Sequence, residues 1–192
     1  MLRALASAAL AGALCACART VAIDPHAVAG MVLQPPPRAA AFALTDQRGR
    51  RFSLAAQHGH AVAIYFGYTH CTDMCPDTMA AFAKALRRAH LSARNVRIVF
   101  ITVDPQRETP AAIGRWLDRF DPRFVGLTGT SAQLLPVYHA YHIFFKNDSP
   151  ASIEHGTTIF FIDPQGRLRI VLDASGASVD DLTRDLRAVA GA

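Results

Sequence analysis

A buried strand that leads through a cysteine-bearing turn into a helix is the feature that most limits how this chain can fold. Residues 61–66 form an unbroken apolar run, which predicts a buried strand. Gly67 ends this run, and residues 76–82 predict the first turns of a helix. Cys71 and Cys75 lie between them, four residues apart. Sites in α/β folds collect at such strand-to-helix junctions, so we expect a functional site here.

The two cysteines are placed where thiol chemistry is favoured. The unpaired N–H groups and the positive dipole end at a helix N-terminus lower the pKa of a thiol and make thiolate accessible near neutral pH. With Cys75 in the first helical turn and Cys71 in the preceding loop, their sulfurs can converge. Convergence suits a disulfide and a soft metal equally. The alternative is that both are small buried core residues, because free cysteine is often buried.

The first residues predict export. Residues 1–17 carry one early positive charge, Arg3, followed by an apolar stretch over 4–14, which is the composition of a signal peptide. This stretch is too short to span a bilayer comfortably. The sequence Leu14-Cys15-Ala16-Cys17 resembles a bacterial lipobox, and this predicts lipidation of Cys17. An ordinary cleaved signal and an uncleaved anchor are the alternatives.

Charge and length exclude some classes of protein. The net charge is +5, and removal of Arg3 with the leader leaves +4. The basic residues are scattered and are not interleaved with aromatic residues, so we expect a basic surface near anionic lipid and no nucleic-acid binding. The remaining length is enough for one full core and not obviously for two.

The order of the elements predicts a thioredoxin-like α/β fold. We expect a flexible tether over residues 18–40 and a single domain over 41–192. The predicted strands lie at 42–44, 51–54, 61–66, 96–103, 125–127, 157–162 and 168–172, and the predicted helices at 76–90, from 110 with Thr109 as its cap, at 131–141 and at 178–189. This order places helices around a central mixed sheet, with an N-terminal β-hairpin and inserted elements.

Several spaced motifs together resemble the Sco/SenC family. They are GYTHCTDMCP at 67–76, VDPQRETP at 103–110, GLTG at 126–129, and EH at 154–155 ahead of FFIDPQG at 160–166. The similarity covers about residues 40 to 190 in the family's order, and agreement of several motifs is more specific than any one of them. It implies a membrane-tethered thioredoxin-like protein that binds copper. Members assemble the dinuclear copper centre of cytochrome c oxidase, and some reduce disulfides of its apo-subunit.

The resemblance implies that Cys71, Cys75 and His155 are the ligands of one copper ion. Two thiolates and an imidazole suit copper, and their incomplete shell leaves a position open for a partner's cysteine. The implied partner is the copper-site subunit of cytochrome c oxidase, together with other periplasmic copper chaperones or thioredoxin-like reductases. The implied location is the periplasmic side of the bacterial inner membrane, with the protein held there by lipid on Cys17.

This chain departs from the family in the site loops. Thr72 stands where the family usually has proline, which frees the loop and restores an N–H donor. Glu154 and Gly156 flank His155 in place of the family's usual Asp and Ser or Thr. His70 and Met74 are weaker candidates for transient contact with a metal, and for Met74 packing is the competing explanation.

Two classes of function remain open from the sequence. The first is a copper chaperone, and the second is a thiol-disulfide oxidoreductase or peroxidase in which Cys71 and Cys75 cycle through a disulfide. We expect mainly a metallochaperone, and whether it is also an enzyme is left open. His155 separates the two classes, because a copper site requires it and simple dithiol exchange does not.

Overall fold

The computed structural model describes residues 21–149 and 152–191. The strands are β1 (Met31–Val32), β2 (Ala43–Asp46), β3 (Arg51–Ser53), β4 (Ala61–Gly67), β5 (Val96–Thr102), β6 (Val125–Thr128), β7 (Phe145–Ser149), β8 (Ser152–His155), β9 (Thr158–Ile162) and β10 (Leu168–Asp173). The helices are the short 3-10 helix η1 (Leu54–Gln57), α1 (Met74–Ala89), α2 (Pro110–Leu117), α3 (Ser131–Ala140) and α4 (Val179–Ala190).

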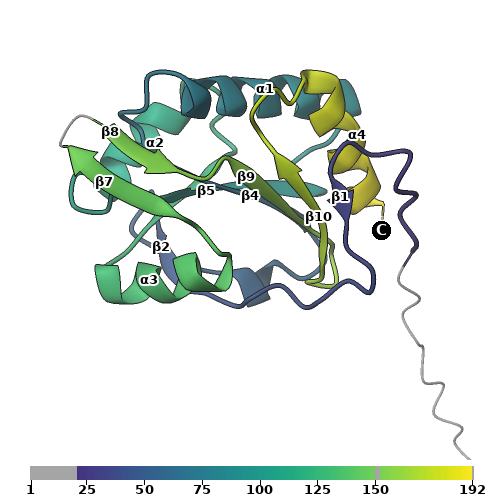
Figure 1. The fold of residues 1–192 in the computed structure, drawn as a ribbon, viewed down its shortest axis with the longest axis horizontal. Helices are drawn as coiled ribbons and strands as arrows, with labels where there is room; N and C mark the ends of the chain where they lie inside the picture. Colours follow the sequence, from purple (N-terminus) through teal and green to yellow (C-terminus); the bar gives the residue numbers. More distant parts are fainter. Residues whose placement is uncertain (1–20, 150–151, 192) are drawn as a thin grey trace, which may run out of the picture.

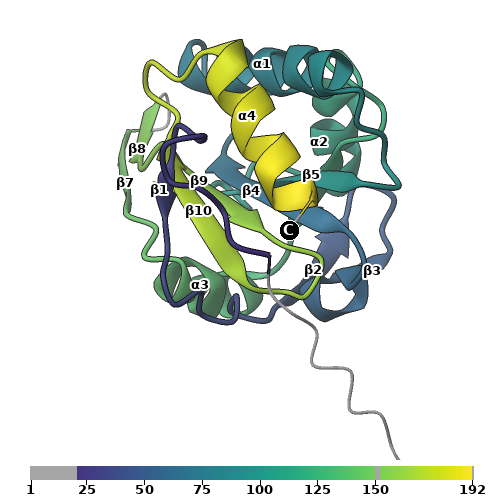
Figure 2. The same cartoon turned by 90° about the vertical axis from the view of Figure 1, so that its right-hand side faces the viewer.

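A mixed sheet divides the molecule. Among the described residues its strand order is β1-β10-β9-β4-β5-β6-β2-β3, with β4, β5 and β6 parallel and the other pairs antiparallel. Helices α1, α2 and α4 cover one face and α3 lies on the other, as Figures 1 and 2 show from two directions. This arrangement confirms the predicted α/β thioredoxin-like fold.

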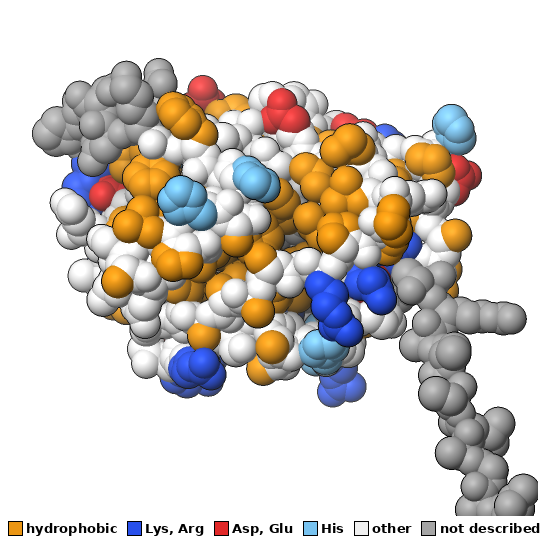
Figure 3. Space-filling model, turned by 60° about the horizontal axis from the view of Figure 1, so that its bottom comes forward, with side chains coloured by type: hydrophobic (Ala, Val, Ile, Leu, Met, Phe, Trp, Pro, Cys, Tyr) orange, Lys and Arg blue, Asp and Glu red, His pale blue; other side chains and the backbone are white. Residues whose placement is uncertain are grey.

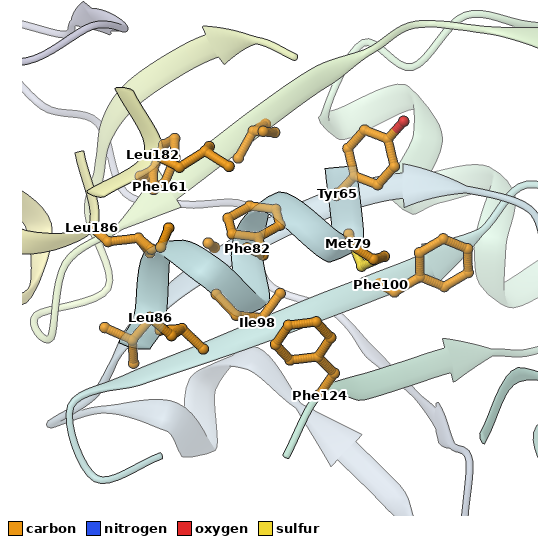
Figure 4. Close-up of a cluster of buried hydrophobic side chains, with 14 of the residues drawn as sticks. Tyr65, Met79, Phe82, Leu86, Ile98, Phe100, Phe124, Phe161, Leu182 and Leu186 are labelled. Atoms are coloured by element: carbon orange, nitrogen blue, oxygen red, sulfur yellow. The ribbon is translucent and has the colours of Figure 1, made fainter. Parts of the chain in front are cut away.

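The apolar run of β4 is continuous because both of its faces are covered. Side chains alternate across a strand, so residues 61, 63 and 65 pack into the core under α1, α2 and α4, whereas 62, 64 and 66 pack into the core under α3. Figure 4 shows the first of these cores, in which Phe82 and Leu86 of α1 meet Leu182 and Leu186 of α4. Full burial of one such side chain stabilises the fold by about 1.5–3 kcal/mol.

The chain before residue 41 is part of this fold, which corrects the predicted tether wherever the structure describes it. Ile23 is buried in the core, and β1 pairs with β10 at the edge of the sheet. The Asp185 carboxylate on α4 accepts the N–H groups of Ala29 at 2.7 Å and Gly30 at 3.0 Å. The proline-rich composition suggested a linker, but a few apolar residues and one buried carboxylate attach the segment to the domain.

The other predicted elements are present with small shifts of their ends. The hairpin near 42–54 is β2 and β3, and Thr109 caps α2 through a hydrogen bond from Ala112 N–H at 3.2 Å. Helix α1 begins at Met74, two residues before the predicted start. Strands β7 and β8, which no sequence pattern predicted, form a separate two-stranded sheet beside the main one.

Candidate functional site

The cysteine turn joins the end of β4 to the first turn of α1. The Cys71 N–H donates to the Tyr68 carbonyl at 3.2 Å, which closes the turn, and Cys75 lies in the first turn of α1. Cys75 is fully buried, Cys71 is half-buried, and neither forms a disulfide. A Cβ at position 67 would lie 2.9 Å from Cys75 Sγ, so the close approach of the thiol to the end of the strand requires Gly67.

Strand β8 brings His155 to the cysteines. Its Nε2 lies 3.6 Å from Cys75 Sγ, and its Nδ1 lies 2.9 Å from the Gly156 carbonyl. A carbonyl only accepts hydrogen bonds, so Nδ1 carries a proton, and in the neutral tautomer that this contact selects the lone pair of Nε2 is directed at Cys75. His155 is 80 residues from Cys75 in the sequence.

Two tyrosines hold the imidazole in place. The Tyr65 and Tyr68 rings lie edge-on to the His155 ring, with centroid distances of 6.3 and 5.7 Å. The Tyr65 hydroxyl also donates to Cys75 Sγ at 3.8 Å. Burial raises the pKa of Tyr65, so its hydroxyl remains a donor at neutral pH.

The two thiols have opposite acidity. Hydrogen bonding from the Cys75 side chain lowers the pKa of Cys71 to about 5, and the backbone N–H groups of Cys75 and Asp73 contribute to this fall. The same hydrogen bond between the two thiols raises the pKa of Cys75, and burial of Cys75 adds to that rise. The pair therefore holds one proton at neutral pH, on the buried Cys75, and presents Cys71 as a thiolate.

Alkylation of the reduced protein tests this assignment. The thiolate is the nucleophile, so the rate at Cys71 is expected to rise from about pH 4 to about pH 6 and then level off, while Cys75 stays slow at pH 7. Peptide mass spectrometry after iodoacetamide pulses reads both sites. Cys75→Ala removes the thiol donor and is expected to move the Cys71 profile to higher pH. A Cys71 rate in the unmodified protein that still climbs above pH 8 would contradict the assignment.

A cleft of about 440 Å³ opens beside the pair. It is lined by Tyr68, Cys71, Met74, Phe144, Ile153, His155, Gly156 and Thr157. Phe144 is 62% exposed at this cleft, and Met74 is half-buried. On the face of the molecule shown in Figure 3, apolar side chains form patches and the Lys and Arg side chains stand in small separate groups. Because Cys71 and His155 both line the cleft, a molecule that enters it can reach them.

The structure also places the other residues that the sequence singled out near the cysteines and His155. The exposed His70 places Nδ1 3.8 Å from Glu108 Oε1, Thr72 is exposed, and Gly156 has open space where a Cβ would be. Within 21–149 and 152–191, no group of three or more Cys, His, Asp or Glu residues meets the spacing of a metal site. Cys71 Sγ instead accepts the Cys75 N–H at 3.5 Å.

Sequence reasoning missed Tyr65, Tyr68 and Glu108 as parts of this region. Tyr65 and Tyr68 carried a weak signal, since both lie at the carboxyl end of a predicted strand. The predicted signal peptide and Cys17 lie outside the described residues. None of the helices in the described part of the chain is long and apolar enough to cross a bilayer.

Comparison with known proteins gives one consistent family. Residues 32–191 match the SCO1/SenC family model. A mitochondrial SCO2 homologue of Bos taurus is 36% identical over 132 residues, which are 65% of this chain and 50% of that protein. An SCO2-like protein of Rickettsia prowazekii is 32% identical over 75% of this chain and 74% of its own length.

A comparison with solved structures supports the same family. The copper-bound structure of Bradyrhizobium japonicum ScoI superimposes with a TM-score of 0.70 and 31% identity, and the match covers 79% of this chain and 99% of that one. The matched region is only about half of the mammalian relative. With the family model covering residues 32–191, this chain belongs to the SCO1/SenC family.

Proposed function

We propose that this protein binds one copper ion through Cys71, Cys75 and His155 and delivers it to the dinuclear copper site of cytochrome c oxidase. The observation that carries the proposal is the 3.6 Å approach of His155 Nε2, with its lone pair available, to Cys75 Sγ beside the Cys71 thiolate. The copper held by the related Bradyrhizobium japonicum protein supports the choice of metal.

The donor set suits copper. Thiolates are soft ligands, imidazole is a common copper ligand, and a three-ligand site leaves room for a fourth ligand from a target protein. To join the other two donors, the Cys71 side chain has to turn from the Cys75 N–H toward His155, and the cleft beside it provides the space. Cys75 also has to lose its proton, so copper binding releases protons.

Delivery is then a ligand exchange without a change of oxidation state. A target thiol loses its proton to solvent, and its sulfur bonds to the copper ion in the open position. The bond from Cys71 to copper breaks, and Cys71 returns to the thiolate that its low pKa favours. A second target ligand then replaces His155 and Cys75, and Cys75 takes up a proton again.

Reduction of the target's cysteines is the second candidate, and the unequal acidity of the two thiols favours it. The Cys71 thiolate attacks a target disulfide and forms a mixed disulfide, releasing one target thiolate. Cys75 then loses its proton, for which His155 Nε2 is the nearby acceptor, and attacks Cys71 Sγ. The second target thiolate leaves, so the target gains two electrons and Cys71 and Cys75 become a disulfide. A peroxidase using the same pair is the remaining alternative.

We place this activity on the periplasmic side of the inner membrane, with the chain attached through lipid on Cys17. The apolar leader and the lipobox-like sequence ending at Cys17 support this placement. Since Ile23 packs in the core, only a short segment separates that cysteine from the first core residue.

Copper transfer to a reduced soluble domain of the oxidase copper-site subunit tests the function. The Cu(I)-loaded protein, with Cys15→Ser and Cys17→Ser, is mixed with the target without oxygen, and native mass spectrometry follows the copper. The expected result is movement of copper to the target with both partners still reduced. Retained copper, together with reduction of an oxidised target by the copper-free protein, would instead favour the thiol reductase.

A further inference from the structure

Glu108 is a buried carboxylate that the copper and thiol chemistry leaves unused. It lies in the loop between β5 and α2, and its side chain has no exposed surface. Oε2 accepts the Thr102 hydroxyl at 2.5 Å, and Oε1 accepts the Thr69 N–H. Buried carboxylates are uncommon unless they are paired, so two donors from different segments indicate a specific contact.

Both carboxylate oxygens have to be acceptors. Thr102 Oγ1 accepts the Asp104 N–H at 2.8 Å and donates its own hydrogen to Glu108. The backbone N–H of Thr69 can only donate. Burial is the larger effect and raises the pKa of Glu108, and the hydrogen bonds from Thr102 and Thr69 offset part of this rise. The side chain of Glu108 thus satisfies one donor on each of two segments, Thr69 and Thr102.

This contact fixes the cysteine turn to the rest of the sheet. Thr69 lies two residues before Cys71 within the turn closed by the Cys71 N–H and the Tyr68 carbonyl. The Val103 N–H also donates to the Gly67 carbonyl at 2.8 Å, so the β5–α2 loop contacts both ends of the segment 67–69. Glu108 thus connects the loop after β5 to the turn that carries Cys71.

We propose that Glu108 is a positioning residue that holds the turn before Cys71 in the position from which Cys71 can bind one copper ion together with Cys75 and His155. The role in metal capture rests on the proposed function, whereas the role in holding the turn does not. Glu108 acts by accepting the hydrogen bond from the Thr69 N–H.

Glu108→Leu tests the proposal because leucine fills the space and accepts no hydrogen bond. In the reduced, metal-free protein, the amides of Thr69 and Cys71 are expected to exchange hydrogen at least tenfold faster. With Cys15→Ser and Cys17→Ser in every sample, Cu(I) affinity against a competing chelator is expected to fall about tenfold, the lower end of what loss of a supporting partner costs a metal site.

Asp185→Leu is the matched control. Asp185 is also a buried carboxylate that accepts two backbone N–H groups, but those belong to Ala29 and Gly30. This variant is expected to lower the melting temperature while leaving the exchange of Thr69 and the Cu(I) affinity unchanged. If Glu108 only stabilised the fold, Glu108→Leu would likewise lower the melting temperature and leave the exchange of Thr69 and the Cu(I) affinity unchanged.

The outcomes separate this inference from the proposed function. Unchanged exchange at Thr69 and Cys71 in Glu108→Leu overturns the inference, whatever the copper result. Weak Cu(I) binding by the unmodified protein overturns the proposed function, and the exchange rates still decide the role of Glu108. Should Glu108→Leu fail to fold, Glu108→Met decides, because methionine keeps the length of the side chain but offers no oxygen to the Thr69 N–H. A loss of at least threefold in Cu(I) affinity then supports the inference, and wild-type affinity overturns it.

Discussion

His155→Ala is expected to weaken Cu(I) binding by about 100-fold, a loss at the upper end of the 10- to 100-fold cost of removing a supporting group, since here a ligand itself is lost. The imidazole supplies the one nitrogen donor beside Cys75, and alanine leaves two sulfurs only. Competition with a chelator in the absence of oxygen measures the change, with Cys15→Ser and Cys17→Ser present throughout.

His139→Ala is the matched control for this prediction. His139 is exposed in the last turn of α3, where it lines a different hollow with His142 and Phe145. The control is expected to keep wild-type affinity. Equal affinity of the His155→Ala variant and the unmodified protein would remove His155 from the ligand set and favour thiol redox chemistry at Cys71 and Cys75.

Arg169→Leu is expected to lower the free energy of unfolding by about 3–5 kcal/mol, which is typical when one partner of a buried ion pair is removed. Arg169 Nη1 lies 3.0 Å from Asp163 Oδ2, and the two side chains are 3% and 0% exposed. Arg169 Nη2 also donates to the Val21 carbonyl at 2.6 Å. Leucine leaves the carboxylate of Asp163 buried without its cation and releases the N-terminal segment. Urea denaturation measures the change.

The same substitution at the surface gives the control. Arg88 of α1 pairs with Asp180 of α4 at 2.6 Å, and both side chains are about 60% exposed. Arg88→Leu is expected to cost about 0–1 kcal/mol, because water and salt screen an exposed pair. A loss below about 1 kcal/mol for Arg169→Leu would show that the buried pair does not stabilise the fold as argued.

Local patterns were enough to predict most of the fold. The apolar run of β4 and the Thr109-Pro110 start of α2 depend on nearest neighbours in the sequence, and both elements are where the patterns predicted. The segment before residue 41 was misread because its attachment depends on Asp185 and β10, which are more than 130 residues away. Composition alone cannot report a contact of that range.

The residues of the site also differ in whether the local sequence marks them. The spacing of Cys71 and Cys75 at a strand-to-helix junction indicated the chemistry directly from the sequence. His155 was recognised only through the family resemblance, because nothing local marks a lone histidine 80 residues away as a neighbour of Cys75. Glu108 was missed because charged residues are usually exposed, and its burial follows from donors on two other segments.

X-ray absorption at the copper edge of the Cu(I)-loaded protein counts the donor atoms around the metal and so tests the three-ligand site. With Cys15→Ser and Cys17→Ser present, we expect two sulfur ligands and one nitrogen ligand, and only the two sulfurs in His155→Ala. A spectrum with sulfur ligands alone in the unmodified protein, unchanged by His155→Ala, would contradict the three-ligand copper site.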